Sequence, residues 1–134
     1  MKGLTSGIHH VGLSVSKLEE SVQFFTELLG WKEVKRDMNY PAIFVSDGSI
    51  MLTLWSVKSD SSIKFDRKNN VGLHHLALSV ESEDMLITIY KRLLNAGTLI
   101  EFSPEPLQIG PSTHMMCYDP SGIRIEFIWT CHQS

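Results

Sequence analysis

Cysteine is scarce in this chain of 134 residues, which contains only Cys117 and Cys131. Two cysteines are too few for a disulfide framework, and neither belongs to a C-x-x-C pair. The N-terminal residues lack the apolar stretch of a signal peptide. No apolar run reaches the ~18 residues that a membrane-spanning helix needs. These absences predict a reduced protein in the cytoplasm, with no membrane as a partner.

An excess of positive charge is also missing. The formal net charge is −3 and the sequence pI is near 6.0, so we expect no nucleic-acid partner, which would require a basic face. Hydrophobic residues make up 43% of the chain and charged residues 20%, the balance of a folded protein. The length fits one domain over residues 1–134, large enough to bury a core without disulfides.

The sequence contains an internal repeat. The segment Gly7-Ile8-His9-His10-Val11-Gly12-Leu13-Ser14-Val15 returns as Gly72-Leu73-His74-His75-Leu76-Ala77-Leu78-Ser79-Val80. Alternating apolar residues predict a strand in each copy. A helical pattern follows each strand. The first begins at a Ser16 cap with Glu19 completing a capping box and ends at Gly30, and the second begins after Ser82 and ends at Gly97.

Three short strand-like runs follow each helix. They span residues 31–37, 42–46 and 50–57 in the first half, and 98–102, 114–118 and 123–130 in the second. Residues 59–70 are polar and poor in structural signals, as in a linker. The sequence therefore predicts an α+β protein of two βαβββ modules, at about residues 7–58 and 71–130.

Strand alternation decides which side chains share a face. Val11, Leu13 and Val15 form an apolar face suited to packing beneath the helix, so His10 lies on the opposite face. By the same count His75 lies on the corresponding face of the second module. We expect both histidines to face the pocket, although a slip by one residue would exchange His10 for His9.

Glu126 lies among apolar residues of the last strand, where a carboxylate is costly to bury unless something neutralises it. Two imidazoles and one carboxylate form a facial triad that leaves metal positions open for substrate. We therefore predict His10, His75 and Glu126 as ligands of one divalent metal ion. Fe, Mn, Ni, Co and Zn all suit these ligands, so the metal stays open.

These motifs resemble the vicinal oxygen chelate superfamily, which includes glyoxalase I, extradiol dioxygenases, fosfomycin thiol transferases and bleomycin-binding proteins. The resemblance rests on His-x-x-Leu-x-Val opening each half, Phe-Phe-x-x-x-Leu-Gly-Trp ending the first helix, and Asp-Pro-Ser-Gly-Ile-Arg-Ile-Glu-Phe near the end. It implies a curved eight-stranded mixed sheet around a metal pocket. It also implies pairing of modules within a chain or across a two-fold homodimer, and we expect the dimer.

Glyoxalase I and the epimerases of this group carry a fourth ligand in the first module. Counting from the turn glycine, Gly48 leads to Leu52 as Gly122 leads to Glu126, and leucine cannot bind a metal. The remaining ligand set is similar to that of extradiol dioxygenases, so a ring-cleaving dioxygenase acting on a small molecule with neighbouring oxygens is the first hypothesis. A glyoxalase-type lyase or isomerase, a thiol transferase and a non-catalytic drug-binding protein are the alternatives.

His114 and Tyr118 are four residues apart on one predicted strand, and therefore on one face. Either side chain is suited to donate a proton or bind an anionic oxygen. We predict them as catalytic residues. Cys117 points to the opposite face as an inert core residue.

Overall fold

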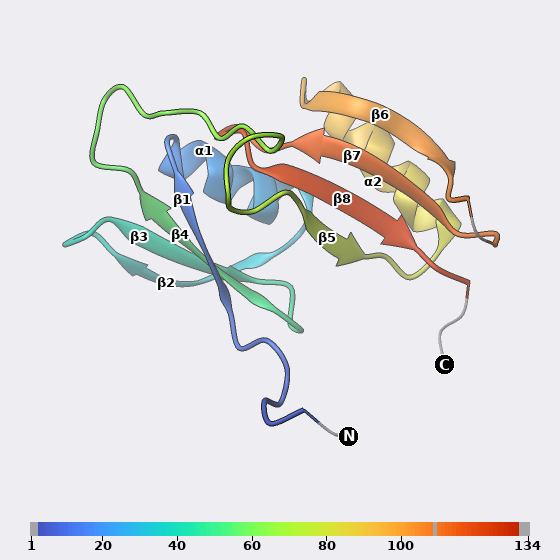
Figure 1. Cartoon of the computed structure of the whole chain (residues 1–134), viewed down its shortest axis with the longest axis horizontal. Helices are drawn as coiled ribbons and strands as arrows, with labels where there is room; N and C mark the ends of the chain where they lie inside the picture. Colours follow the sequence, from blue (N-terminus) through green and yellow to red (C-terminus); the bar gives the residue numbers. More distant parts are fainter. Residues whose placement is uncertain (1–2, 109, 132–134) are drawn as a thin grey trace. The chain divides into compact units, whose positions relative to one another are not determined.

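The computed structural model describes residues 3–108 and 110–131 and divides the chain into two compact units, Met1–Ser62 and Ile63–Ser134. Each unit has its own helical segment and its own four-stranded mixed sheet (Figure 1). The predicted α+β class and the βαβββ order of both modules are confirmed. The boundary between the units falls within the segment expected to be a linker.

The first unit contains β1 (Val11–Val15), α1 (Leu18–Gln23), η1 (Phe24–Leu28), β2 (Lys32–Asp37), β3 (Ala42–Ser46) and β4 (Met51–Ser56). Its strand order is β1-β4-β3-β2, with β1 parallel to β4 and the other pairs antiparallel. The predicted capping box at Ser16 is wrong. Lys17 is the residue before the helix, and the Glu19 carboxylate pairs instead with the Arg36 guanidinium.

The second unit contains β5 (Leu76–Ser79), α2 (Glu83–Asn95), β6 (Leu99–Pro106), β7 (Thr113–Tyr118) and β8 (Arg124–Trp129), with strand order β5-β8-β7-β6. The Ser82 hydroxyl caps α2 by accepting a hydrogen bond from the Met85 amide at 3.0 Å, as the sequence predicts. Gly97 follows the helix at φ 80°, a conformation that favours glycine. Among the described residues, no helix is of a length and apolarity that would let it cross a membrane.

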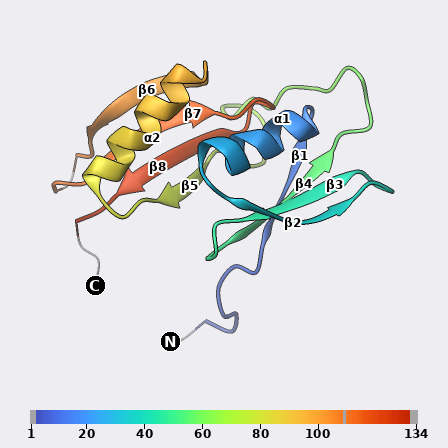
Figure 2. The same ribbon diagram turned by 180° about the vertical axis from the view of Figure 1, so that it is seen from behind.

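Each sheet packs one face against its helix. In the second unit α2 lies against β6, β7 and β8 (Figure 2), and the side chains beneath it are the buried Met115, Cys117, Ile125 and Phe127. Burial raises the pKa of the Cys117 thiol to about 12, so this cysteine is protonated core, as predicted. The opposite face of each sheet, here called the far face, carries the alternate residues.

The two hairpin turns before the last strands differ by one residue. In both turns an aspartate accepts hydrogen bonds from the next backbone amides, Asp47 from Ser49 and Ile50, and Asp119 from Ser121 and Ile123. Ile50 therefore corresponds to Ile123, and Gly48 does not correspond to Gly122. Counting from the glycines gave a register that is wrong by one position.

Candidate functional site

The far face of the second sheet carries a row of polar side chains from neighbouring strands. On β7 and β8 the ladder pairs Met116 with Glu126 and Tyr118 with Arg124. His114 lies two residues before Met116 and four before Tyr118, so His114 and Tyr118 share this face, as predicted. Ala77 of β5 pairs with Glu126. His75 lies two residues before Ala77, directly before the start of β5.

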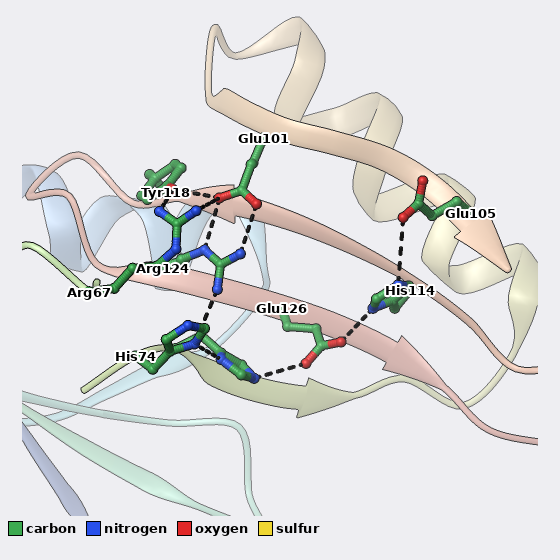
Figure 3. Close-up of polar contacts among 9 residues, drawn as sticks. Arg67, His74, Glu101, Glu105, His114, Tyr118, Arg124 and Glu126 are labelled. Carbon is green, nitrogen blue, oxygen red and sulfur yellow. Dashed lines mark hydrogen bonds and ion pairs between the residues drawn. The ribbon is translucent and has the colours of Figure 1, made fainter. Parts of the chain in front are cut away.

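Glu126 lies between two imidazoles (Figure 3). Its Oε1 is 3.2 Å from His75 Nε2, and its Oε2 is 2.5 Å from His114 Nδ1. The residue is only 8% exposed, and the His114 ring lies within hydrogen-bond distance as a polar partner of the buried carboxylate. The other His114 nitrogen, Nε2, is 3.8 Å from Glu105. The structure thus brings together His75, His114 and Glu126.

A second polar cluster lies beside the first on the same sheet. Arg124 binds the Glu101 carboxylate through two hydrogen bonds, of 2.8 and 2.7 Å, and the Tyr118 hydroxyl donates a third at 2.5 Å. Arg67 Nη1 donates to the Tyr118 oxygen at 3.3 Å. The Arg124 guanidinium and the other donors lower the pKa of Glu101 to about 2. The hydrogen bond that the Tyr118 hydroxyl donates to the Glu101 carboxylate raises the pKa of Tyr118.

His74 joins the two clusters. Its Nδ1 is 3.3 Å from Arg124 Nη1 and 2.7 Å from His75 Nδ1. Burial and then the Arg124 charge lower the pKa of His74, which favours the neutral imidazole. A continuous line of contacts therefore runs from Glu101 through Arg124, His74 and His75 to Glu126.

His10 belongs to the first unit, where its Nδ1 is 2.9 Å from His9 Nδ1. This doublet repeats the contact of His74 with His75. The residue of the first sheet that corresponds to Glu126 is Thr53, because Thr53 pairs with Gly12 as Glu126 pairs with Ala77. The expectation that Leu52 occupies this position is wrong. Leu52 is fully buried beneath the helix, while the Thr53 hydroxyl accepts a hydrogen bond from Trp55 Nε1 at 2.8 Å.

Comparison with known proteins identifies the family. The model of the Glyoxalase/Bleomycin resistance protein/Dioxygenase superfamily matches residues 7–127. The chain belongs to this superfamily. A superfamily domain of solved structure from Frankia sp. EAN1pec superimposes with a TM-score of 0.80 at 30% identity, covering 93% of this chain and 98% of that one. The predicted family resemblance is therefore confirmed.

Two superfamily relatives have different activities in their names. Lactoylglutathione lyase of Salmonella typhimurium is 31% identical over 130 residues, which cover 89% of each chain. Metapyrocatechase of Pseudomonas sp. (strain CF600) is 29% identical over 113 residues, which cover 84% of this chain but only 34% of that enzyme. The superfamily thus contains both lyases and dioxygenases, and its members typically use a divalent metal.

The second module fits one side of such a metal centre. Two ligand atoms about 2.1 Å from one ion and at right angles lie about 3 Å apart, and His75 Nε2 lies 3.2 Å from Glu126 Oε1. Both atoms suit a divalent ion. Within residues 3–108 and 110–131, no group of three or more His, Cys, Asp or Glu side chains is placed so that it could hold a metal ion.

Sequence reasoning missed three residues of the polar clusters. Arg67 lies in the segment expected to be a linker, and strand alternation predicts the His74 side chain on the face opposite to His75. Glu101 lies where the pairing of β6 with β7 shifts between Ile100 and Phe102, so simple alternation does not predict its direction. The signal available in the sequence was an arginine within an apolar strand, because Arg124 in such a strand needs an acidic partner.

Proposed function

We propose that this protein is a divalent-metal-dependent enzyme whose ligands are His10, His75 and Glu126. The substrate is a small molecule that chelates the metal through two neighbouring oxygens, and ring cleavage by a dioxygenase is the first candidate reaction. The working form is a two-fold homodimer, which sedimentation of the purified protein would test.

The observation that carries this proposal is the environment of Glu126. A carboxylate in a largely buried strand has one oxygen held by His114 and the other facing His75 Nε2. His114 supports the carboxylate as an outer-shell partner of a metal ligand would. Tyr118 lies on the same face with its hydroxyl bonded to Glu101 and Arg67, and it would exchange the Glu101 contact to donate a proton to an anionic oxygen of the substrate.

The position of Thr53 favours a three-ligand centre over a four-ligand one. Where a fourth protein ligand would correspond to Glu126, the first module has a hydroxyl already bonded to Trp55. Fewer protein ligands leave more metal positions for a bidentate substrate and for dioxygen. When bound, the metal would act as a Lewis acid and stabilise negative charge on the chelated oxygens. The 29% sequence identity to metapyrocatechase supports ring cleavage as the first candidate reaction.

Lyase chemistry of the glyoxalase type is the second candidate. It is favoured by the relative in Salmonella typhimurium, which matches this chain at 31% identity over 89% of both lengths. The same metal would then stabilise an enolate instead of a catecholate.

The first test is the metal content, by mass spectrometry, of protein purified without added metal. We expect near-stoichiometric metal in the wild type and its loss in His10→Ala and His75→Ala. His9→Ala is the matched control, because it removes the neighbouring imidazole in the first module and should retain the metal. An absence of metal in the wild type, even after reconstitution, would refute the proposal.

The reaction is then tested with the reconstituted protein and two substrates. Ring cleavage of a catechol consumes one dioxygen per molecule and is followed with an oxygen electrode. Isomerisation of a glutathione hemithioacetal consumes none and is followed by absorbance. Turnover of the hemithioacetal alone would replace the dioxygenase hypothesis with the lyase.

A further inference from the structure

We infer that His74, held by Arg124, is a positioning residue that fixes the tautomer of His75 and leaves the His75 Nε2 lone pair directed at Glu126. Its consequence for metal binding rests on the proposed function. The proton arrangement itself depends only on the contacts within the second unit.

Arg124 determines which hydrogen-bonding role His74 plays. The guanidinium is fixed by two hydrogen bonds to Glu101, and its side chain is only 12% exposed. From this anchored position Nη1 lies 3.3 Å from His74 Nδ1. A guanidinium has donors and no acceptor, so in this contact His74 Nδ1 is the acceptor, through a lone pair that it shares between Arg124 and His75.

The contact between the two imidazoles then has one solution. The Nδ1 atoms of His74 and His75 are 2.7 Å apart, which requires one proton between them. Because His74 Nδ1 is an acceptor, that proton belongs to His75. A neutral imidazole carries a single N–H, so Nε2 of neutral His75 has a free lone pair.

This lone pair faces a second acceptor. His75 Nε2 lies 3.2 Å from Glu126 Oε1, and two acceptors at this distance repel each other unless a cation lies between them. A second proton on His75 or a bound metal ion would satisfy both atoms. The network thus holds the ligand nitrogen unprotonated and correctly directed in the neutral state, before metal binds.

The first module provides an internal comparison. His9 and His10 form the same contact, with their Nδ1 atoms 2.9 Å apart. The residue that corresponds to Arg124 is Met51, the first residue of β4 as Arg124 is the first of β8. A thioether cannot donate a hydrogen bond. A contact between two neighbouring histidines therefore does not by itself determine the tautomer. In the second module Arg124 selects the tautomer of His74 and, through it, that of His75.

The tautomer is measured directly by ¹⁵N NMR of the histidine rings in metal-free protein, at about pH 8, above the ordinary histidine pKa of about 6.5. We expect His75 to carry its proton on Nδ1. In His74→Phe, which keeps a ring but removes the acceptor, His75 should become a mixture of tautomers. His74→Asn retains an acceptor near the Nδ1 position and should restore the Nδ1–H form. An Nε2–H form in the wild type, or an unchanged spectrum in His74→Phe, would overturn the inference.

Cobalt(II) titration tests the consequence. We expect His74→Phe to bind cobalt 10–100-fold more weakly than the wild type, the usual effect of losing an outer-shell partner, with recovery in His74→Asn. Equal affinity in all three proteins would contradict the positioning role. If the wild type binds no cobalt, the proposed function fails, while the NMR result still decides the tautomer.

Discussion

The far faces of the two sheets place different chemistry at equivalent positions of the same ladder. In the second module β8 presents Arg124 and Glu126, and in the first module β4 presents Met51 and Thr53. The pairing of β6 with β7 shifts at Glu101, whose carboxylate binds Arg124. The pairing of β2 with β3 shifts at the corresponding residue, the exposed Val34. The duplicated backbone is thus retained while the polar network is confined to one copy.

The first module has aromatic rings on its far face instead. Tyr40 packs edge-on against Trp55 with ring centroids 4.8 Å apart, and Lys58 Nζ lies 4.6 Å from the centroid of Tyr40. Gly12 leaves room for this arrangement, since a Cβ atom there would lie 3.2 Å from Thr53 Oγ1. The comparison shows that the two modules share a scaffold and differ in the polar side chains at a few far-face positions.

The largest effect is expected from making the second module resemble the first at Glu126. Glu126→Thr removes the carboxylate that faces His75, so metal affinity should fall by more than the roughly 100-fold loss of an outer-shell partner. Isothermal titration with cobalt measures the change. Thr53→Ser, a polar substitution at the matching position, is the control and should bind like the wild type. Unchanged affinity in Glu126→Thr would remove Glu126 from the ligand set.

A second test distinguishes the two register assignments of β4. Leu52→Ala should lower the free energy of unfolding by about 2–5 kcal/mol, because it leaves a cavity in the core. Thr53→Ala should lower it by only about 1 kcal/mol, the value of the hydrogen bond from Trp55. Urea denaturation gives both values. A larger loss for Thr53→Ala would reverse the assignment of core and far face.

The third effect is a pH dependence confined to the polar module. The pKa of Glu101 is about 2 in the folded protein, below its ordinary value of about 4.3. The ionised carboxylate therefore stabilises the fold above about pH 4, and this stabilisation is lost as the pH falls toward 2. After allowance for solvent screening, we expect about 1 kcal/mol.

Urea midpoints at several pH values between 2 and 6 measure this dependence. Glu101→Gln should have a flatter profile than the wild type. Glu27→Gln, a change at an exposed carboxylate of the first module, should retain the wild-type slope. Parallel profiles for Glu101→Gln and wild type would contradict a native-state role of the ion pair.

The smallest effect is expected at Gly12. Gly12→Ala brings a Cβ atom to 3.2 Å from Thr53 Oγ1, which is held by Trp55, so a loss below about 1 kcal/mol should appear in thermal unfolding. The second module already has Ala77 at this position. In Gly12→Ala with Thr53→Ala the loss at Gly12 should vanish, and its persistence would place its cause elsewhere.

The sequence predicted the strands, the second helix and the shared face of His114 and Tyr118, because period-two alternation is a local property of the chain. It did not identify Thr53 as the residue that corresponds to Glu126. The two hairpin turns differ in length by one residue, so counting from Gly48 leads to Leu52 instead. It also missed the partners of Arg124. A pairing shift on β6 and an interaction from the segment before β5 are tertiary features that no periodicity encodes.

The ring of Phe65 packs against Gly72, and both residues belong to the second compact unit. A Cβ atom at Gly72 would lie 2.6 Å from the Phe65 ring, so the backbone approaching His74 is packed against residues that look like a tether. A fragment beginning at Val71 would lose both this ring and Arg67. A fragment that keeps both contacts therefore has to begin near Ile63, where the second compact unit starts.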